Sequence, residues 1–151
     1  MKNNIVKFSK ELFIPIVNCI QSKKYNEALI LLDKLSNQDP NIINRFKGSI
    51  YLGKNDWKNS LLHYQKMTNE EKNFKILNNM GYALFKLGRF LEASLKFRQS
   101  LDSNNTFISA YENLIISLKL IGNYKLSIKY ILLAMNLSPI NEKFKNSLID
   151  I

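Results

Sequence analysis

The chain has few of the residues that build cross-linked, metal-binding or turn-rich folds. Cys19 is the one cysteine among 151 residues, so no intramolecular disulfide and no cysteine-based metal site can form. Five glycines and three prolines are too few for an all-β chain with many tight turns. A single thiol fits a reducing compartment, and we expect a cytoplasmic protein.

Long hydrophobic runs are also missing, since no apolar stretch approaches the roughly 18 residues that a membrane-spanning helix needs. The apolar residues 12–17 follow a basic start and precede Cys19, an arrangement that a lipoprotein signal would share. However, Lys10 and Glu11 stand directly against this short stretch, and Asn18 is a poor residue before the cysteine. We therefore expect a first amphipathic helix here rather than an export signal.

Acidic residues are scarce relative to basic ones. The chain has 22 Lys and Arg against 12 Asp and Glu, which gives a formal net charge of +10. Only Arg45, Arg89 and Arg98 are arginines, whereas nucleic-acid readers favour Arg for its planar fork. Abundant Lys, Asn and Ile are typical of an AT-rich coding bias. We interpret most of the charge as solvated helix surface that favours acidic partners.

Groups that carry chemistry are sparse. His63 is the one histidine and is expected on a solvated face, so it cannot anchor a metal site alone. No nucleophile–His–carboxylate set is visible, and all five glycines are isolated, which excludes a phosphate-binding loop. The Glu70-Glu71 pair lies in a polar linker and is interpreted as helix-end charge. We predict no enzyme, no cofactor and no metal.

The most informative feature is a phrase that recurs four times. It has an aromatic residue, two variable residues and a small residue, with a large apolar residue four positions later. Its aromatic residues stand 32, 33 and 34 residues apart, a period typical of repeat architectures. In chain order, the aromatic, small and large residues are Tyr25, Ala28 and Leu32; Trp57, Ser60 and Tyr64; Phe90, Ala93 and Phe97; and Tyr124, Ser127 and Ile131.

Each phrase follows a break. Gly88 and Gly122 stand two residues before the third and fourth aromatic residues, and Lys23 and Asn55 hold that place before the first two. Because glycine and asparagine accept the left-handed backbone that ends a helix, a tight turn is expected there. Apolar residues on both sides recur at steps of three and four, the spacing of helices. The unit is therefore helix, turn, helix. Four concordant phrases argue against an irregular bundle with chance spacing.

These units resemble the tetratricopeptide-repeat (TPR) family over residues 9–141. Met80-Gly81, Ala93 and Phe97 fit the family pattern best. The resemblance implies one all-α domain over residues 1–151, a right-handed superhelical solenoid of about four antiparallel helix pairs with a C-terminal capping helix. The expected units are residues 9–40, 41–73, 74–107 and 108–141, with the cap at 142–151.

The two ends of this array differ from the family pattern. Pro15 falls inside the expected first helix and removes an amide donor, so it should kink or restart that helix and make the first unit divergent. Phe144, Leu148 and Ile149 recur at helical spacing after the last unit. They predict a helix that covers the last pair.

The resemblance also implies a function: a protein-interaction scaffold or chaperone-like adaptor that holds a peptide or partner helix in a concave groove. In this family the first helix of each unit usually lines that groove. The alternative for Tyr82 and Phe85 is that they only pack between neighbouring helix pairs. The expected groove residues are Arg45, Ser49 and Leu52 in the second unit; Lys75, Asn78, Asn79, Tyr82, Phe85 and Lys86 in the third; and Glu112, Asn113, Ile116 and Lys119 in the fourth.

Two observations limit the analogy. Some TPR proteins clamp a C-terminal carboxylate with Lys and Asn, and Arg45, Ser49 and Asn79 stand in comparable places. Ser109 and Asn113 occupy the positions where that clamp needs cations, so chaperone-tail binding is not predicted. Two alternative functions stay open: RNA binding by a basic helical repeat, and self-association through an exposed end of the array.

Overall fold

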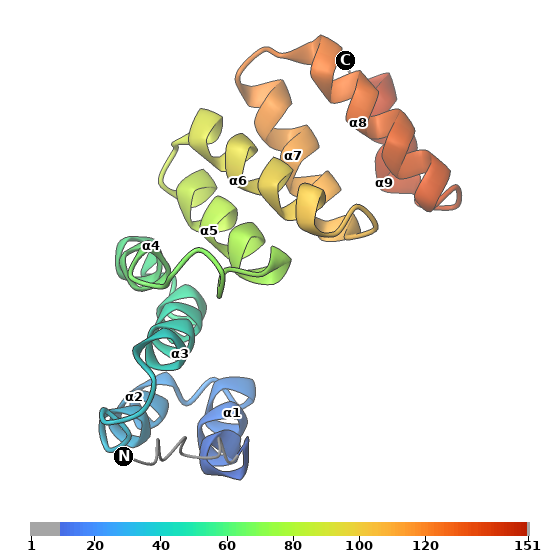
Figure 1. Cartoon of the computed structure of the whole chain (residues 1–151). Helices are drawn as coiled ribbons and strands as arrows, with labels where there is room; N and C mark the ends of the chain where they lie inside the picture. Colours follow the sequence, from blue (N-terminus) through green and yellow to red (C-terminus); the bar gives the residue numbers. More distant parts are fainter. Residues whose placement is uncertain (1–9, 151) are drawn as a thin grey trace, which may run out of the picture.

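The structure is a computed structural model, and it describes residues 10–150 of the 151. The basic start of the chain, residue 9 of the first expected unit and residue 151 of the expected cap lie outside these residues. Figure 1 shows helix pairs stacked along a curved path. A 3₁₀ turn (Lys10–Phe13) precedes α1 (Ile14–Gln21), α2 (Tyr25–Asp33), α3 (Pro40–Gly53), α4 (Trp57–Gln65), α5 (Phe74–Lys86), α6 (Phe90–Ser103), α7 (Ile108–Leu120), α8 (Tyr124–Leu137) and α9 (Glu142–Ile149).

The turn inside each pair has the same geometry in all four pairs. Lys23, Asn55, Gly88 and Gly122 have left-handed backbone, with φ of 58°, 61°, 75° and 74°. In each turn, the backbone amide of the residue directly before the aromatic residue donates a hydrogen bond to a carbonyl of the first helix. In the third pair, Arg89 N donates to Leu84 O at 3.0 Å. This bond satisfies a carbonyl that the helix end would leave free. The predicted turns are confirmed.

Glycines allow the two helices of the second and third pairs to approach closely. A Cβ on Gly48 would lie 2.6 Å from a ring carbon of Tyr64, and one on Gly81 equally close to the ring of Phe97. In the second pair, Ser60 Oγ also donates a hydrogen bond of 2.8 Å to the carbonyl of Gly48. The small and large residues of the repeated phrase therefore meet where the helices cross.

The core is a row of side chains between helices rather than one central cluster. One apolar cluster joins the 3₁₀ turn, α1, α2 and α3, with Ile16, Leu32 and Ile50 almost inaccessible to solvent. A second cluster runs from Leu61 in α4 to Phe144 in α9. Contacts are made between consecutive helices and between the first helices α3, α5 and α7. This is the arrangement of an all-α solenoid, as predicted.

The predictions for the two ends are largely confirmed. The chain changes from a 3₁₀ turn to α-helix at Ile14, with Pro15 in the first turn of α1, where its missing amide donor is tolerated. Cys19 is a buried core residue. At the other end α9 contacts α8, and Phe144 of α9 is buried in the second apolar cluster. Of the three predicted cap residues, Phe144 is buried, whereas Leu148 is 38% exposed and Ile149 is 80% exposed.

The prediction that His63 lies on a solvated face is wrong. Its ring stacks on Tyr51 of α3 with centroids 5.4 Å apart, and its Nδ1 lies 2.9 Å from Oδ1 of Asn44. Its partial burial lowers the pKa of the imidazole, and Lys66 and Lys47 lower it further. His63 therefore belongs to the contact between α3 and α4.

Candidate binding groove

The first helices of successive pairs form one continuous face of the molecule. α3 contacts α5, and α5 contacts α7. In Figure 1, α1 and α5 lie on the inner side of the curved path, and α2 and α4 lie on its outer side. We call the inner surface of α1, α3, α5, α7 and α9 the groove face. All thirteen residues predicted for binding lie on α3, α5 and α7.

The predicted residues differ widely in their exposure. Arg45, Lys75, Lys86 and Ile116 are exposed, whereas Asn78 is buried, with 8% of its surface accessible. Leu52, Tyr82 and Phe85 are partly buried and pack against the core, so the packing alternative holds for part of their surface. The remaining predicted residues are part-buried: Ser49, Asn79, Glu112, Asn113 and Lys119.

A chain of hydrogen bonds joins α3, α4 and α5 at the groove face. Asn79 Nδ2 donates to the hydroxyl of Tyr64 at 3.2 Å. The Tyr64 hydroxyl lies 3.0 Å from Ser49 Oγ, which in turn donates to the carbonyl of Arg45. Burial raises the pKa of Tyr64, while the bonds to Ser49 and Asn79 act in the opposite direction. The phenol therefore stays protonated at neutral pH and fixes the centre of the face.

A second bond joins α5 to α7. Asn113 Nδ2 donates to Oδ1 of the buried Asn78 at 3.2 Å. Because Asn78 is buried and its amide oxygen already accepts from Asn113, it forms part of the wall of the groove. The sequence located both asparagines on first helices but could not show that they bond to each other across two units.

Positive charge dominates the groove face. α3, α5 and α7 carry Arg45, Lys47, Lys75, Lys86 and Lys119 but one acidic residue, Glu112. Glu112 pairs with Lys143 of α9 at 3.1 Å, and Lys47 pairs with Asp33 of α2 at 2.9 Å. No carboxylate pairs with Arg45, Lys75, Lys86 or Lys119 among the residues that the structure describes. The face therefore has four cations available to a ligand.

Three of these four cations rest on aromatic rings. The guanidinium of Arg45 lies 5.5 Å from the centroid of Phe46, and the ammonium of Lys75 lies 5.8 Å from that of Phe74. Lys86 Nζ lies 5.4 Å from the centroid of Tyr82 and 5.9 Å from that of Trp57, whose rings meet edge to face. A ring holds a cation in place without neutralising its charge. These cations are therefore partly ordered before a ligand arrives.

Two small cavities open on the groove face. One of about 290 Å³ lies between α1 and α3, among Val17, Ile20, Gln21, Arg45, Phe46 and Ser49. The other, of about 230 Å³, lies between α7 and α9, among Glu112, Asn113, Ile115, Ile116, Lys143, Phe144 and Ser147. Both are lined mainly by apolar surface. Sequence reasoning missed Val17, Ile20 and Phe144 as lining residues because they lie on the divergent first helix and on the cap.

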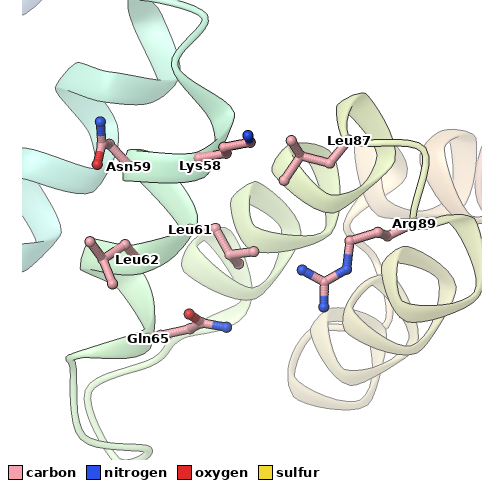
Figure 2. Close-up of a pocket in the computed structure, with 7 residues that line it drawn as sticks. All are labelled: Lys58, Asn59, Leu61, Leu62, Gln65, Leu87 and Arg89. Carbon is pink, nitrogen blue, oxygen red and sulfur yellow. The ribbon is translucent and has the colours of Figure 1, made fainter.

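A larger cavity of about 560 Å³ lies away from the predicted residues. Figure 2 shows the residues that line it: Lys58, Asn59, Leu61, Leu62 and Gln65 on α4, and Leu87 and Arg89 in the turn from α5 to α6. Arg89 is held by Glu92 through two hydrogen bonds of 2.6 and 2.7 Å. Size alone does not make it the binding site, since it offers one cation without a carboxylate partner, Lys58.

The described residues lack features of other site classes. No group of three or more His, Cys, Asp or Glu side chains within residues 10–150 could hold a metal ion. In the same range, no helix is both long enough and apolar enough to cross a membrane.

Comparison with known proteins places the fold. The TPR2B domain of yeast Sti1, in a complex with pHsp70, superposes with a TM-score of 0.61 at 22% identity, covering 74% of this chain and 90% of that one. A MamA structure (AMB-1) superposes with a TM-score of 0.75 at 14% identity, covering 91% and 76%. This chain has the TPR fold. No family model and no curated protein matches its sequence.

A longer structure of Sti1 agrees with this assignment. Its TPR2AB domain, in a complex with pHSP90, superposes with a TM-score of 0.61 at 19% identity. The match covers 87% of this chain and 59% of the Sti1 chain. At such identities the likeness describes the TPR architecture of this chain, and its ligand must be argued from its own groove face.

Proposed function

We propose that this TPR protein is a protein-interaction scaffold that holds an acidic segment of a partner protein on the groove face. The observation that carries the proposal is the set of four cations without a carboxylate partner on α3, α5 and α7: Arg45, Lys75, Lys86 and Lys119. The one acidic residue of these helices, Glu112, is already neutralised by Lys143. A face of one sign attracts and orients a ligand of the opposite sign.

The chemistry of the face suits a peptide better than a small molecule. The cations are spread over three helices, whereas each cavity on the face is smaller than the roughly 300–1,000 Å³ that whole small ligands occupy. The Sti1 domains with this fold are in complexes with pHsp70 and pHSP90, which supports a peptide as the ligand class. Ser109 and Asn113 stand where a clamp for a C-terminal carboxylate needs cations, so we do not propose such a carboxylate as the ligand.

Titration with a synthetic peptide tests the proposal, using Trp57 as the reporter. Trp57 is the one tryptophan of the chain and lies beside Lys86, so its fluorescence should change when a carboxylate approaches that ammonium. The probe is a peptide of alternating glutamate and serine at low ionic strength. A peptide of alternating lysine and serine and an RNA oligomer of similar length serve as comparisons.

A charge-matched pair of variants localises the binding. Arg45→Glu/Lys86→Glu reverses two cations on the groove face, and Lys125→Glu/Lys129→Glu reverses two exposed lysines on α8. The acidic peptide should bind the wild type and the α8 variant equally and the groove variant at least tenfold more weakly. Equal weakening of peptide binding in both variants would show that net charge alone, and not the groove face, accounts for the binding. Binding of RNA without binding of the peptide would favour the nucleic-acid alternative.

A further inference from the structure

The groove face has an open apolar cavity at each end and none of comparable kind between them among the cavities described above. The two cavities occupy matching places between first helices. Arg45 and Ser49 of α3 line one, and Glu112 and Ile116 line the other at the corresponding turns of α7. Each is apolar on most of its surface, and each is large enough for one aliphatic or aromatic side chain.

Side-chain hydrogen bonds bridge the two intervening contacts between first helices. Between α3 and α5, Asn79 donates to the Tyr64 hydroxyl, which lies 3.0 Å from Ser49 Oγ. Between α5 and α7, Asn113 donates to Asn78. The contacts between α3 and α5 and between α5 and α7 are therefore hydrogen-bonded, and an apolar side chain cannot enter them without leaving a buried polar group unpaired.

The rims of both cavities expose apolar surface to solvent. Val17 of α1 is 37% exposed and Ile116 of α7 is 48% exposed, and both line a cavity. Covering such side chains is favourable by roughly 25 cal/mol per Å² of apolar area. Between them lie the cations of the face, which repel other cations and favour carboxylates.

Resting on the function proposed above, we infer that the ligand is an acidic segment with two apolar anchor residues, one for each end cavity. Three helix-to-helix steps separate the two cavities, and neighbouring helices pack roughly 8–10 Å apart. An extended chain advances roughly 3.3 Å per residue. The two anchors of an extended ligand are therefore separated by about eight residues, and these intervening residues are acidic or polar.

A set of labelled peptides tests this specificity by fluorescence anisotropy. The first has two leucines separated by about eight residues of glutamate and serine. The second has the same composition with the two leucines separated by about half that length. The third replaces both leucines by serine. The first should bind at least tenfold more tightly than the third, and the second should bind no more tightly than a peptide with one anchor.

Three variants with matched chemistry assign the anchors. Val17→Glu and Ile116→Glu each place a carboxylate at one cavity, and each should remove the advantage of the first peptide. Leu95→Glu on α6 is the control, because Leu95 is 47% exposed, close to Ile116, and lines neither cavity. It should bind the first peptide as the wild type does. Circular dichroism and melting temperature verify that all three fold.

The possible results separate this inference from the proposed function. If all three peptides bind equally and the cavity variants change nothing, the two-anchor inference is wrong and the acidic groove stands. If only one cavity variant weakens binding, a single anchor replaces the pair. If no acidic peptide binds, both the inference and the proposed function fail.

Discussion

A Cβ atom on Gly81 of α5 would lie 2.6 Å from the Cε1 atom of the Phe97 ring in α6. Real Cβ atoms do not approach aromatic carbons so closely, and the ring is fully buried. The two helices of the third pair therefore approach this closely because Gly81 has no side chain. The same relationship joins Gly48 and Tyr64 in the second pair.

Gly81→Ala should lower the free energy of unfolding by up to about 2 kcal/mol. Overpacking a core contact costs about 1–3 kcal/mol, and the better helix propensity of alanine offsets roughly 1 kcal/mol of that cost. Urea denaturation followed by circular dichroism measures the change. In the double variant with Phe97→Leu, the smaller side chain should relieve the clash. The double variant should therefore lose less than the sum of the two single changes, and strict additivity would contradict the close contact.

Tyr64→Phe should lower the free energy of unfolding by about 1–2 kcal/mol. The change keeps the ring against Gly48 but removes the hydroxyl that Asn79 and Ser49 contact. The loss follows from the broken bonds and from the partners left without them. Chemical denaturation gives the magnitude. Tyr124→Phe on α8 is the control, because Tyr124 is 50% exposed and its hydroxyl has no bond among the described residues. An equal effect in both variants would show that the hydrogen bonds of the Tyr64 hydroxyl do not contribute to stability.

The helix pairs could be predicted from the sequence because their signals are local. The repeated phrase marks the crossing of two helices that are neighbours in the chain, and Lys23, Asn55, Gly88 and Gly122 mark the turns between them. Even Lys23 adopts the left-handed backbone that its place in the repeat predicts. Such features depend on residues within one unit, so a periodic pattern is sufficient to find them.

The groove was predicted less completely because its details depend on how units stack. The bond between Asn78 and Asn113 joins residues 35 positions apart, and the pair of Glu112 with Lys143 depends on where the cap lies. His63 is an exception inside one unit, because its contacts with Tyr51 and Asn44 depend on the angle between α3 and α4, which the repeat pattern does not give. A repeat pattern identifies which helix carries a residue, but the rotation of that helix against the next unit decides what the residue contacts.

His63 should make stability fall as the pH drops below about 6.5. Burial, assisted by Lys66 and Lys47, lowers the pKa of His63 from its ordinary value of 6.5. The unfolded chain therefore binds the proton at a higher pH than the folded one does. The stabilising contribution is present above the unfolded pKa and is lost as the pH falls through the folded pKa. Urea denaturation at pH 7.5 and 5.5 measures this loss.

His63→Gln is the control for that titration. Glutamine can still reach Asn44 but carries no proton that titrates in this range. The variant should lose less stability than the wild type between the two pH values, since carboxylates contribute equally to both proteins. An identical loss in the two proteins would show that protonation of His63 does not contribute to the pH dependence of stability.

The serines at equivalent places in α4 and α8 should respond in opposite directions to removal of the hydroxyl. Ser60 Oγ donates to the carbonyl of Gly48, whereas Ser127 Oγ is buried without a hydrogen-bond partner among residues 10–150. The fourth pair has Ile115 where the second has Gly48, and we attribute the lost bond to this larger side chain between the helices. A buried hydroxyl without a partner costs about 1–3 kcal/mol, and a satisfied one contributes about 1 kcal/mol.

Ser60→Ala should therefore lower the free energy of unfolding by about 1 kcal/mol, whereas Ser127→Ala should leave it unchanged or raise it by about 1 kcal/mol. Both changes remove the same atom from a fully buried site in the second helix of a pair, so each serves as the control for the other. Thermal and urea denaturation of the two variants under identical conditions give the comparison. Equal destabilisation would mean that Ser127 has a partner in solution, such as a bound water, and would contradict the explanation based on Ile115.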